Sequence, residues 1–104
     1  LDHYINRKRL LAEKYNDWFS KTDNLFILEP KESKSNYWIN AFLAKNLEER
    51  NKILEYTNHN KVMTRPAWTP MHLLDIYKSN LRMNLRITES IESRLVNIPS
   101  SVIL

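Results

Sequence analysis

The chain of 104 residues contains no glycine, and this absence limits its possible folds more than any other feature of the sequence. At average usage a chain of this length would contain about seven glycines. Glycine-rich phosphate loops are excluded, and with them P-loop and Rossmann dinucleotide sites. Turns that need a positive φ must use other residues, and asparagine and aspartate tolerate that region best. We therefore predict turns at Asn24, Asn58, Asn60 and Asn80.

The composition is that of one small globular domain with a modest core. Apolar residues make up 42% of the chain and charged residues 27%. No apolar run reaches the roughly 18 residues that a membrane span needs, and no signal-peptide pattern opens the chain. With no cysteine, disulfides and thiolate metal ligands are excluded. These features favour a cytoplasmic protein with no membrane partner.

Hydrophobic spacing predicts the order helix, strand, strand, helix, strand, helix, helix. The first six elements are expected at residues 2–19, 25–29, 36–44, 46–58, 61–65 and 71–77. The last helix carries Ile87, Ile91 and Leu95 at a spacing of four and should stop before Pro99. This order predicts an α+β fold in which a small sheet of about three strands is packed with helices.

Aromatic side chains are expected to supply much of the core. One stripe of the first helix should face inward, formed by Tyr4, Leu11, Tyr15 and Trp18. Tyr37 and Trp38 alternate along the second strand, so one should face the core and the other a helix or a domain interface. We predict that Trp18 and Trp38 are both buried. Asn46 should cap the second long helix, with Glu48 and Glu49 in its first turn.

The segment Thr64–His72 (TRPAWTPMH) combines two prolines with three side chains that can bind ligands. Each proline fixes its own φ and disfavours helix in the residue before it, so the segment should be stiff and extended. Arg65, Trp68 and His72 then offer a guanidinium fork, a flat ring and an imidazole, which suit an anionic ligand with a flat or sugar part. The alternative is structural: Trp68 packs in the core, Arg65 pairs with a carboxylate, and His72 braces the loop.

No complete catalytic set or metal site is visible elsewhere. The three histidines form no cluster with each other or with carboxylates at metal-ligand spacing. The net charge of +4 raises the odds of a phosphate-bearing ligand or a nucleic acid, but it is also usual for solvated helix faces. A nucleic-acid site would need exposed aromatics among the basic side chains, whereas the aromatics here fall on expected core stripes.

The Thr64–His72 phrase resembles the C-terminal region of the DegT/DnrJ/EryC1/StrS aminotransferases, which aminate nucleotide-linked keto-sugars with pyridoxal phosphate. Three further phrases resemble that family in the same order: Arg7–Trp18 (RKRLLAEKYNDW), Ser35–Ala41 (SNYWINA) and Arg94–Ser101 (RLVNIPSS). Ser35–Ala41 and Leu95–Ser101 are similar to the LegC-type subgroup, linked to bacillosamine and legionaminic acid sugars. The family commonly has a glycine before the TRP phrase, where this chain has Asn60 and Lys61.

The resemblance implies that residues 1–104 form the small C-terminal domain of a fold-type-I aminotransferase. A preceding large domain would hold the pyridoxal phosphate through its lysine, since no phrase here matches the family's lysine loop. This chain would contribute no catalytic or cofactor-binding residue and no metal ligand, and would be inactive alone. Arg65, Trp68 and His72 would be substrate-binding residues. The intact enzyme would act on a nucleotide-sugar, take its amino group from glutamate and form a homodimer.

The ends of the chain fit a fragment of a longer protein. It starts at Leu1, inside a helical pattern and without an initiator methionine, and it ends on an apolar tail at residues 102–104. Two other functions stay open. One is a stand-alone protein-interaction module that binds through exposed aromatics and the apolar tail. The other is a small basic nucleic-acid-binding domain.

Overall fold

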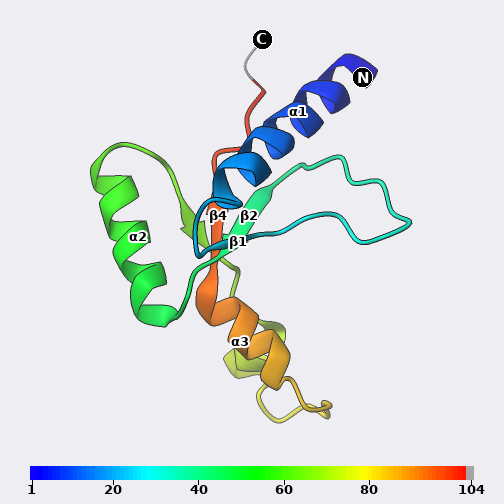
Figure 1. Ribbon diagram of the computed structural model, residues 1–104. Coiled ribbons are helices and arrows are strands. Elements are labelled where there is room, and N and C mark those ends of the chain that lie inside the picture. Colours follow the sequence, from blue (N-terminus) through cyan, green and yellow to red (C-terminus); the bar gives the residue numbers. More distant parts are fainter. Residues whose placement is uncertain (103–104) are drawn as a thin grey trace.

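The computed structural model describes residues 1–102 and has an α+β architecture, with helices packed on one antiparallel sheet (Figure 1). The α-helices are α1 (Asp2–Phe19), α2 (Leu47–His59) and α3 (Arg86–Arg94). The strands are β1 (Leu25–Phe26), β2 (Asn40–Leu43), β3 (Arg65–Pro66) and β4 (Leu95–Ile98). Two short 3₁₀ turns, η1 (Met71–Leu73) and η2 (Asp75–Tyr77), replace the single helix expected at residues 71–77.

The sheet has four strands in the order β1-β2-β4-β3, so β4 lies between β2 and β3. The prediction of a helix through Leu95 is wrong here, because α3 ends at Arg94 and the chain continues directly as β4. Leu95 keeps the helical spacing of Ile87 and Ile91. Pairing with a strand on each side satisfies the backbone of Leu95–Ile98, and this tertiary hydrogen bonding outweighs the local periodicity.

One face of the sheet carries the core. Phe42 of β2 lies opposite Val96 of β4, and side chains of such a pair project to the same face. Val96 is fully buried, and the Phe42 ring contacts the Phe19 ring of α1 with centroids 4.6 Å apart. Phe19 in turn stacks on Phe26 at 5.8 Å. The buried cluster is completed by Ala12, Tyr37 and Ala44, with Tyr15, Ile53, Leu54 and Ile98 packed against it.

Both tryptophans predicted to be buried are exposed. Trp18 has 61% of its surface exposed and Trp38 has 71%, and Tyr4 of the same expected stripe is also exposed. The second strand starts only at Asn40, so Trp38 lies before the sheet rather than in it. Of the adjacent aromatic pair, Tyr37 is the buried member. Helical spacing therefore identified Tyr15 as a residue that packs on the core, but it extended the buried stripe too far toward the start of α1, and near the end of α1 it placed Trp18 inside where Phe19 is the buried residue.

The sequence suggested that turns with positive φ would fall on asparagine, but within residues 1–102 no asparagine has a positive φ. These turns fall on Glu32, Tyr37 and Lys61, with φ of 62°, 46° and 63°. Lys61 closes α2 in a Schellman motif: its N–H donates to Asn58, and the N–H of Val62 donates to Thr57 at 2.8 Å. Glycine is the favoured residue at such a position, and this chain uses lysine.

The start of α2 follows the prediction. The side-chain oxygen of Asn46 accepts a hydrogen bond from the N–H of Glu49 at 2.9 Å, which is an N-cap. Glu48 and Glu49 lie in the first turn, where the helix dipole favours negative charge. Both pair with Lys52 on the helix surface.

A polar staple fixes the long loop between β1 and β2 to α1. Arg9 donates to both carboxylate oxygens of Glu29, at 3.0 and 2.7 Å, and to the carbonyl of Ser35. The N–H of Ser35 donates back to Glu29 at 2.6 Å. The Arg9 hydrogen bonds, followed by that from Ser35, lower the pKa of Glu29 from 4.5 to about 2. Arg9 also lies 5.6 Å over the ring of Tyr37, so one guanidinium contacts this loop at Glu29, Ser35 and Tyr37.

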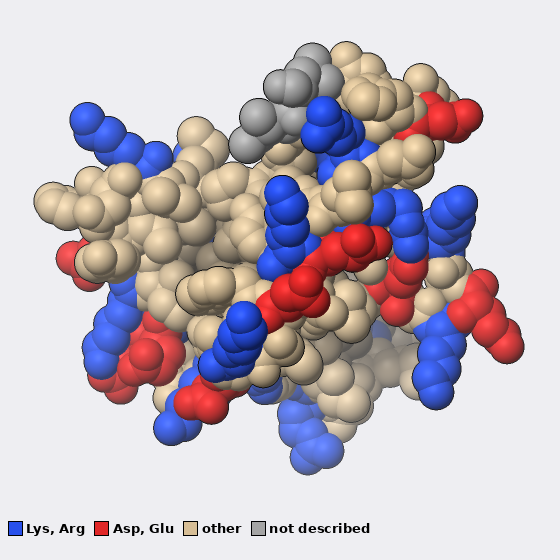
Figure 2. All heavy atoms as spheres, turned by 45° about the horizontal axis from the view of Figure 1, so that its top comes forward, with Lys and Arg blue, Asp and Glu red and all other residues tan. Residues whose placement is uncertain are grey.

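Charged side chains of both signs are interspersed on the surface. Figure 2 shows lysine and arginine next to aspartate and glutamate across the face that it presents, without one large basic area. Among residues 1–102, no helix combines the length and the apolar character that crossing a membrane requires.

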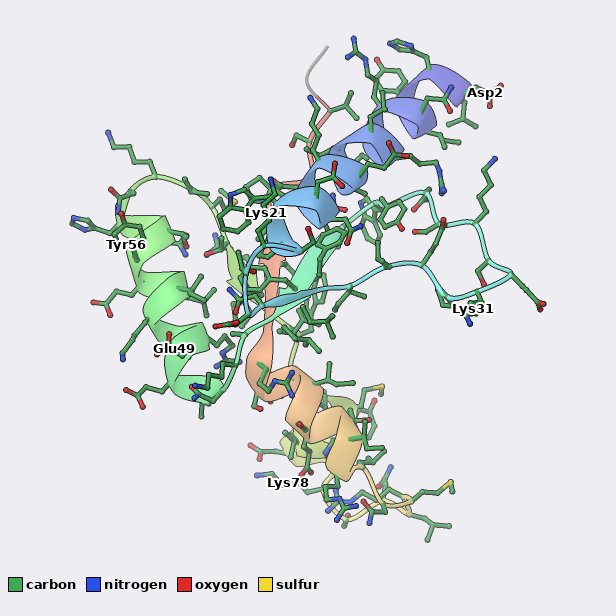
Figure 3. All side chains as sticks on the ribbon, in the orientation of Figure 1. Asp2, Lys21, Lys31, Glu49, Tyr56 and Lys78 are labelled. Atoms are coloured by element: carbon green, nitrogen blue, oxygen red, sulfur yellow. The ribbon has the colours of Figure 1, made fainter. Side chains whose placement is uncertain are left out.

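The two 3₁₀ turns, the following loop and α3 form a lobe at the end of the molecule away from α1 (Figure 1). Leu74, between the two turns, has an extended conformation with φ −73° and ψ 136°, which prevents one continuous helix. Many large apolar side chains of this lobe are exposed, and Figure 3 shows the side chains around Lys78 standing clear of the sheet. The most exposed of them are Ile76, Leu81, Met83 and Ile87.

Candidate functional site

Arg65 lies on β3, at the edge of the sheet, and projects from the face opposite the core. It pairs with Asn97 of β4, whereas Pro66 pairs with the fully buried Val96. Because side chains alternate along a strand, Arg65 and Asn97 share the face that α1 and α2 do not cover. Arg65 is exposed, and no ion pair joins it to a carboxylate in the described part of the chain. A guanidinium in this position is available to an anion.

Trp68 joins Arg65 in one hollow of about 620 Å³. The indole has 76% of its surface exposed, so it is not a packed anchor within residues 1–102. Pro66 and Pro70 bracket the loop and restrict its backbone, as the sequence predicted. The hollow is lined by Arg65, Pro66, Ala67, Trp68 and Thr69 of this segment, with Ile39 and Asn97 from the sheet.

His72 does not share that hollow. It lines a neighbouring one of about 470 Å³ together with Tyr77 and Arg82. Its Nε2 lies 2.9 Å from Oε1 of Glu89 on α3, and its side chain is only 8% exposed. The backbone carbonyl of His72 accepts a hydrogen bond from Arg82 at 3.0 Å. These contacts fasten η1 to α3 and to the loop before it, which is the bracing role that the sequence left open.

Sequence patterns alone identified few of the other residues around these hollows. Asn97 lies in a segment that was expected to be helical, so its place opposite Arg65 could not be inferred. Glu89 and Arg82 are far from His72 in sequence, and only the folding of η1 against α3 brings them together. Ile39 was expected within a strand, and its alternation with Asn40 could have placed it on the open face.

A larger hollow of about 850 Å³ lies on the core face of the sheet, between α1 and α2. Phe42 and Ile98 form its floor, and its other lining residues are mostly apolar or aromatic. Among the described residues that line it, Lys52 alone is charged, and it already pairs with Glu48 and Glu49. This hollow therefore offers no uncompensated charge to a phosphate, and we place the candidate site on the opposite face, at Arg65.

The residues around Arg65 do not fit pyridoxal phosphate. The cofactor needs a lysine for its Schiff base and a carboxylate for its pyridine nitrogen. The lining of the Arg65 hollow contains neither, and the His72 hollow contains no lysine. Within residues 1–102, no group of three histidine, aspartate or glutamate side chains lies in a position to hold a metal ion. The site contains a guanidinium, a group that can pair with an anion, and an indole, a group that can pack against a flat or sugar ring.

Comparison with known proteins identifies relatives of this chain. GDP-perosamine synthase from Escherichia coli O157:H7 is 30% identical over 102 residues, which is 95% of this chain and 27% of that protein. The sequence model of the DegT/DnrJ/EryC1/StrS aminotransferase family matches residues 1–104. The chain thus spans about a quarter of the length of the proteins that it matches.

Solved structures of sugar aminotransferases share the fold. The aminotransferase TlmJ from Streptoalloteichus hindustanus superposes with a TM-score of 0.80 at 20% identity, covering 92% of this chain and 26% of TlmJ. CalS13 from Micromonospora echinospora, a sugar aminotransferase, gives 0.80 at 17% identity, covering 95% and 26%. Spr1654 from Streptococcus pneumoniae, in its PMP form, gives 0.80 at 18% identity, with the same coverage as CalS13. Sequence and fold agree, and the chain belongs to the DegT/DnrJ/EryC1/StrS aminotransferase family.

Proposed function

We propose that residues 1–104 form the C-terminal domain of a pyridoxal-phosphate-dependent aminotransferase that aminates a nucleotide-linked keto-sugar. The amino group comes from glutamate, and the product is an amino sugar of the bacillosamine or legionaminic type. The intact enzyme is a cytoplasmic homodimer. Its large domain supplies the cofactor lysine, and this chain alone is inactive. The family match over the whole chain supports the reaction class.

The observation that carries the proposal is the exposed Arg65 guanidinium beside an exposed indole. Arg65 has no carboxylate partner within the described residues and opens into the same hollow as Trp68. A guanidinium binds a phosphate through two parallel hydrogen bonds, which an ammonium group cannot do. The ring of Trp68 offers a flat apolar surface to a base or a sugar. Together they match the two chemically different ends of a nucleotide-sugar.

His72 is also proposed as a substrate-binding residue, in a different position from the other two. Its Nε2 lies next to the carboxylate of Glu89, so a ligand would meet the other ring nitrogen, Nδ1. The histidine ring and the Glu89 carboxylate can be removed separately. Comparing His72→Ala with Glu89→Gln therefore separates a direct ligand contact from the bracing of η1.

The test is steady-state kinetics of the full-length protein that carries this chain, with UDP- and GDP-linked keto-sugars as substrates and glutamate as amino donor. Arg65→Ala should raise KM for the preferred sugar, because it removes one charge-assisted contact that contributes about 1.5–3 kcal/mol to binding. Arg65→Lys should recover only part of that loss, because the ammonium group lacks the planar fork. Arg86→Ala, on α3 and outside the hollow, is a matched control and should leave KM unchanged.

Melting temperatures of the same variants provide the second measurement. Since Arg65 is exposed, its removal should leave the melting temperature within about 2 °C of the parent, because surface substitutions change stability little. Unchanged kinetics together with a lowered melting temperature would show that Arg65 is structural. An intact protein that transfers no amino group to any of these sugars would refute the proposed reaction.

A further inference from the structure

We propose that Asn97 is a positioning residue for the Arg65 hollow: it anchors the carbonyl of Pro66 and so sets the direction in which the loop presents Trp68 beside Arg65. Its side-chain Nδ2 donates to that carbonyl at 3.1 Å. The benefit to ligand binding rests on the proposed function, whereas the anchoring itself does not.

The loop has few other attachments at this end. β3 is only two residues long and lies at the edge of the sheet, and Pro66 has no N–H with which to extend the pairing. Beyond the pairing of Pro66 with Val96, Asn97 is the one side chain of residues 1–102 that bonds to the backbone of residues 66–69, and η1 then begins with the hydrogen bond from Leu73 to the carbonyl of Pro70. The Asn97 amide is therefore the side-chain contact by which the described part of the sheet holds the chain just before Trp68.

Asn97 itself is well placed to hold a fixed direction. It belongs to β4, an inner strand paired with β2 on one side and β3 on the other. Its neighbours along the strand are the fully buried Val96 and the partly buried Ile98. Because this backbone is held on both sides, the Asn97 amide has a fixed position on the face of the sheet that lies opposite the core. Asn97 also lines the hollow, next to its register partner Arg65.

Stiffness elsewhere in the loop makes one anchor sufficient. The two prolines leave Ala67, Trp68 and Thr69 with a narrowed set of backbone conformations. Fixing the carbonyl of Pro66 then selects among the few remaining directions for the indole. A loop already ordered before binding loses less entropy when a ligand arrives, and this raises affinity.

The first experiment measures the loop without any ligand. The full-length protein is labelled with 5-fluorotryptophan, and the Trp68 resonance is assigned with Trp68→Phe. Asn97→Leu keeps the side-chain volume but removes the donor, so it should shift or broaden the Trp68 resonance. Asn97→Gln keeps the carboxamide, so its Trp68 resonance should lie closer to that of the parent than the resonance of Asn97→Leu does. The resonances of Trp18 and Trp38 are internal references, and Asn6→Leu, on the exposed surface of α1, is the matched control.

The second experiment measures affinity by calorimetric titration with UDP and with GDP. Asn97→Leu should weaken binding of the preferred nucleotide about three- to tenfold, the usual effect of one neutral hydrogen bond. Asn97→Asp should weaken it further, since an ionised carboxylate cannot donate to Pro66 and places a negative charge beside Arg65. Asn6→Leu should bind as the parent does.

The outcomes separate this inference from the proposed function. A parent protein that binds neither nucleotide would refute the proposed function, and the fluorine spectra would still decide whether Asn97 orders the loop. A Trp68 resonance that is unchanged in Asn97→Leu overturns the anchoring. A change of all three tryptophan resonances together with a lowered melting temperature also overturns it, because Asn97 would then support the domain as a whole.

Discussion

The two faces of the sheet differ in what their side chains do, and β4 shows the difference within two consecutive residues. Val96 is fully buried and faces the aromatic cluster of Phe19, Phe26 and Phe42. Asn97 projects to the other face, beside an exposed arginine and an exposed tryptophan. The first face supplies stability through burial. The second leaves the side chains of Arg65 and Trp68 exposed, and the packing of the first face holds the strand that carries Asn97 in place.

Substitution of Phe42 should give the largest effect, because it removes a ring from the buried face. Phe42→Ala should lower the free energy of unfolding by about 3–5 kcal/mol. The matched variant on the open face is Trp68→Ala, which removes a larger ring that is 76% exposed and should change the free energy by less than about 0.5 kcal/mol. Urea unfolding followed by circular dichroism measures both.

Equal losses for Phe42→Ala and Trp68→Ala would remove the contrast between the faces. They would mean that Trp68 packs against other residues of this chain in solution. A large loss of unfolding free energy for Phe42→Ala but not for Trp68→Ala would support the contrast between the two faces. The hollow around Trp68 could then be altered without harm to the fold.

The Arg9–Glu29 staple should give a smaller effect that depends on pH. The pKa of Glu29 is lowered to about 2 in the folded chain, so the folded state binds a proton there less readily than the unfolded state does. The stabilisation is therefore complete above the ordinary glutamate pKa of 4.5 and is lost as the pH falls toward 2. Glu29→Gln should be less stable than the parent at pH 7, and the gap should close between about pH 5 and pH 2.

Unfolding of parent and variant at a series of pH values measures that gap. Glu55→Gln, on α2 and without an ion pair among the described residues, is the control and should follow the parent at every pH. A gap of constant size from pH 7 to pH 2 would show that Glu29 acts through its shape and hydrogen bonds rather than through its charge.

Lys61→Gly should give a small change of the opposite sign. Lysine at φ 63° is disfavoured by its Cβ, whereas glycine adopts this conformation without that cost. Part of the gain is offset because glycine loses more conformational entropy on folding. A net stabilisation of about 0.5–1 kcal/mol is expected in urea unfolding. Lys45→Gly, in the loop before α2, is the control and should not stabilise the chain.

The sequence predicted the parts of the fold that depend on local chemistry. The helix at residues 2–19 has the predicted bounds, and Asn46 caps α2 as its side chain suggested. It also predicted the α+β class, since the class follows from the order of elements. β4 was missed because Leu95–Ile98 owes its conformation to two neighbouring strands that are distant in sequence.

Only the part of the candidate site that depends on neighbouring residues could be predicted from the sequence. Arg65 and Trp68 lie within four residues of each other, and Pro66 and Pro70, which restrict the backbone around Trp68, are visible in the sequence. Asn97 and Glu89 contribute through contacts across the fold, at Pro66 and at His72. No local pattern reports such contacts. Whether Arg65, Trp68 and His72 bind substrate stays a prediction.

Trp38→Ala should give the smallest effect, and it is the sharpest check on where the core ends. The predicted strand at residues 36–44 placed Trp38 inside, which would make its removal cost about 3–5 kcal/mol. In the structure the indole is 71% exposed, and the contacts of its backbone remain after substitution: the N–H donates to Asn36, and the carbonyl accepts from Lys8. We therefore expect a change below about 0.5 kcal/mol. Tyr37→Ala is the matched neighbour, because it removes a ring that is only 8% exposed and whose hydroxyl accepts the N–H of Glu29. A larger loss of unfolding free energy for Trp38→Ala than for Tyr37→Ala would contradict this assignment, because it would mean that Trp38 rather than Tyr37 packs in the core.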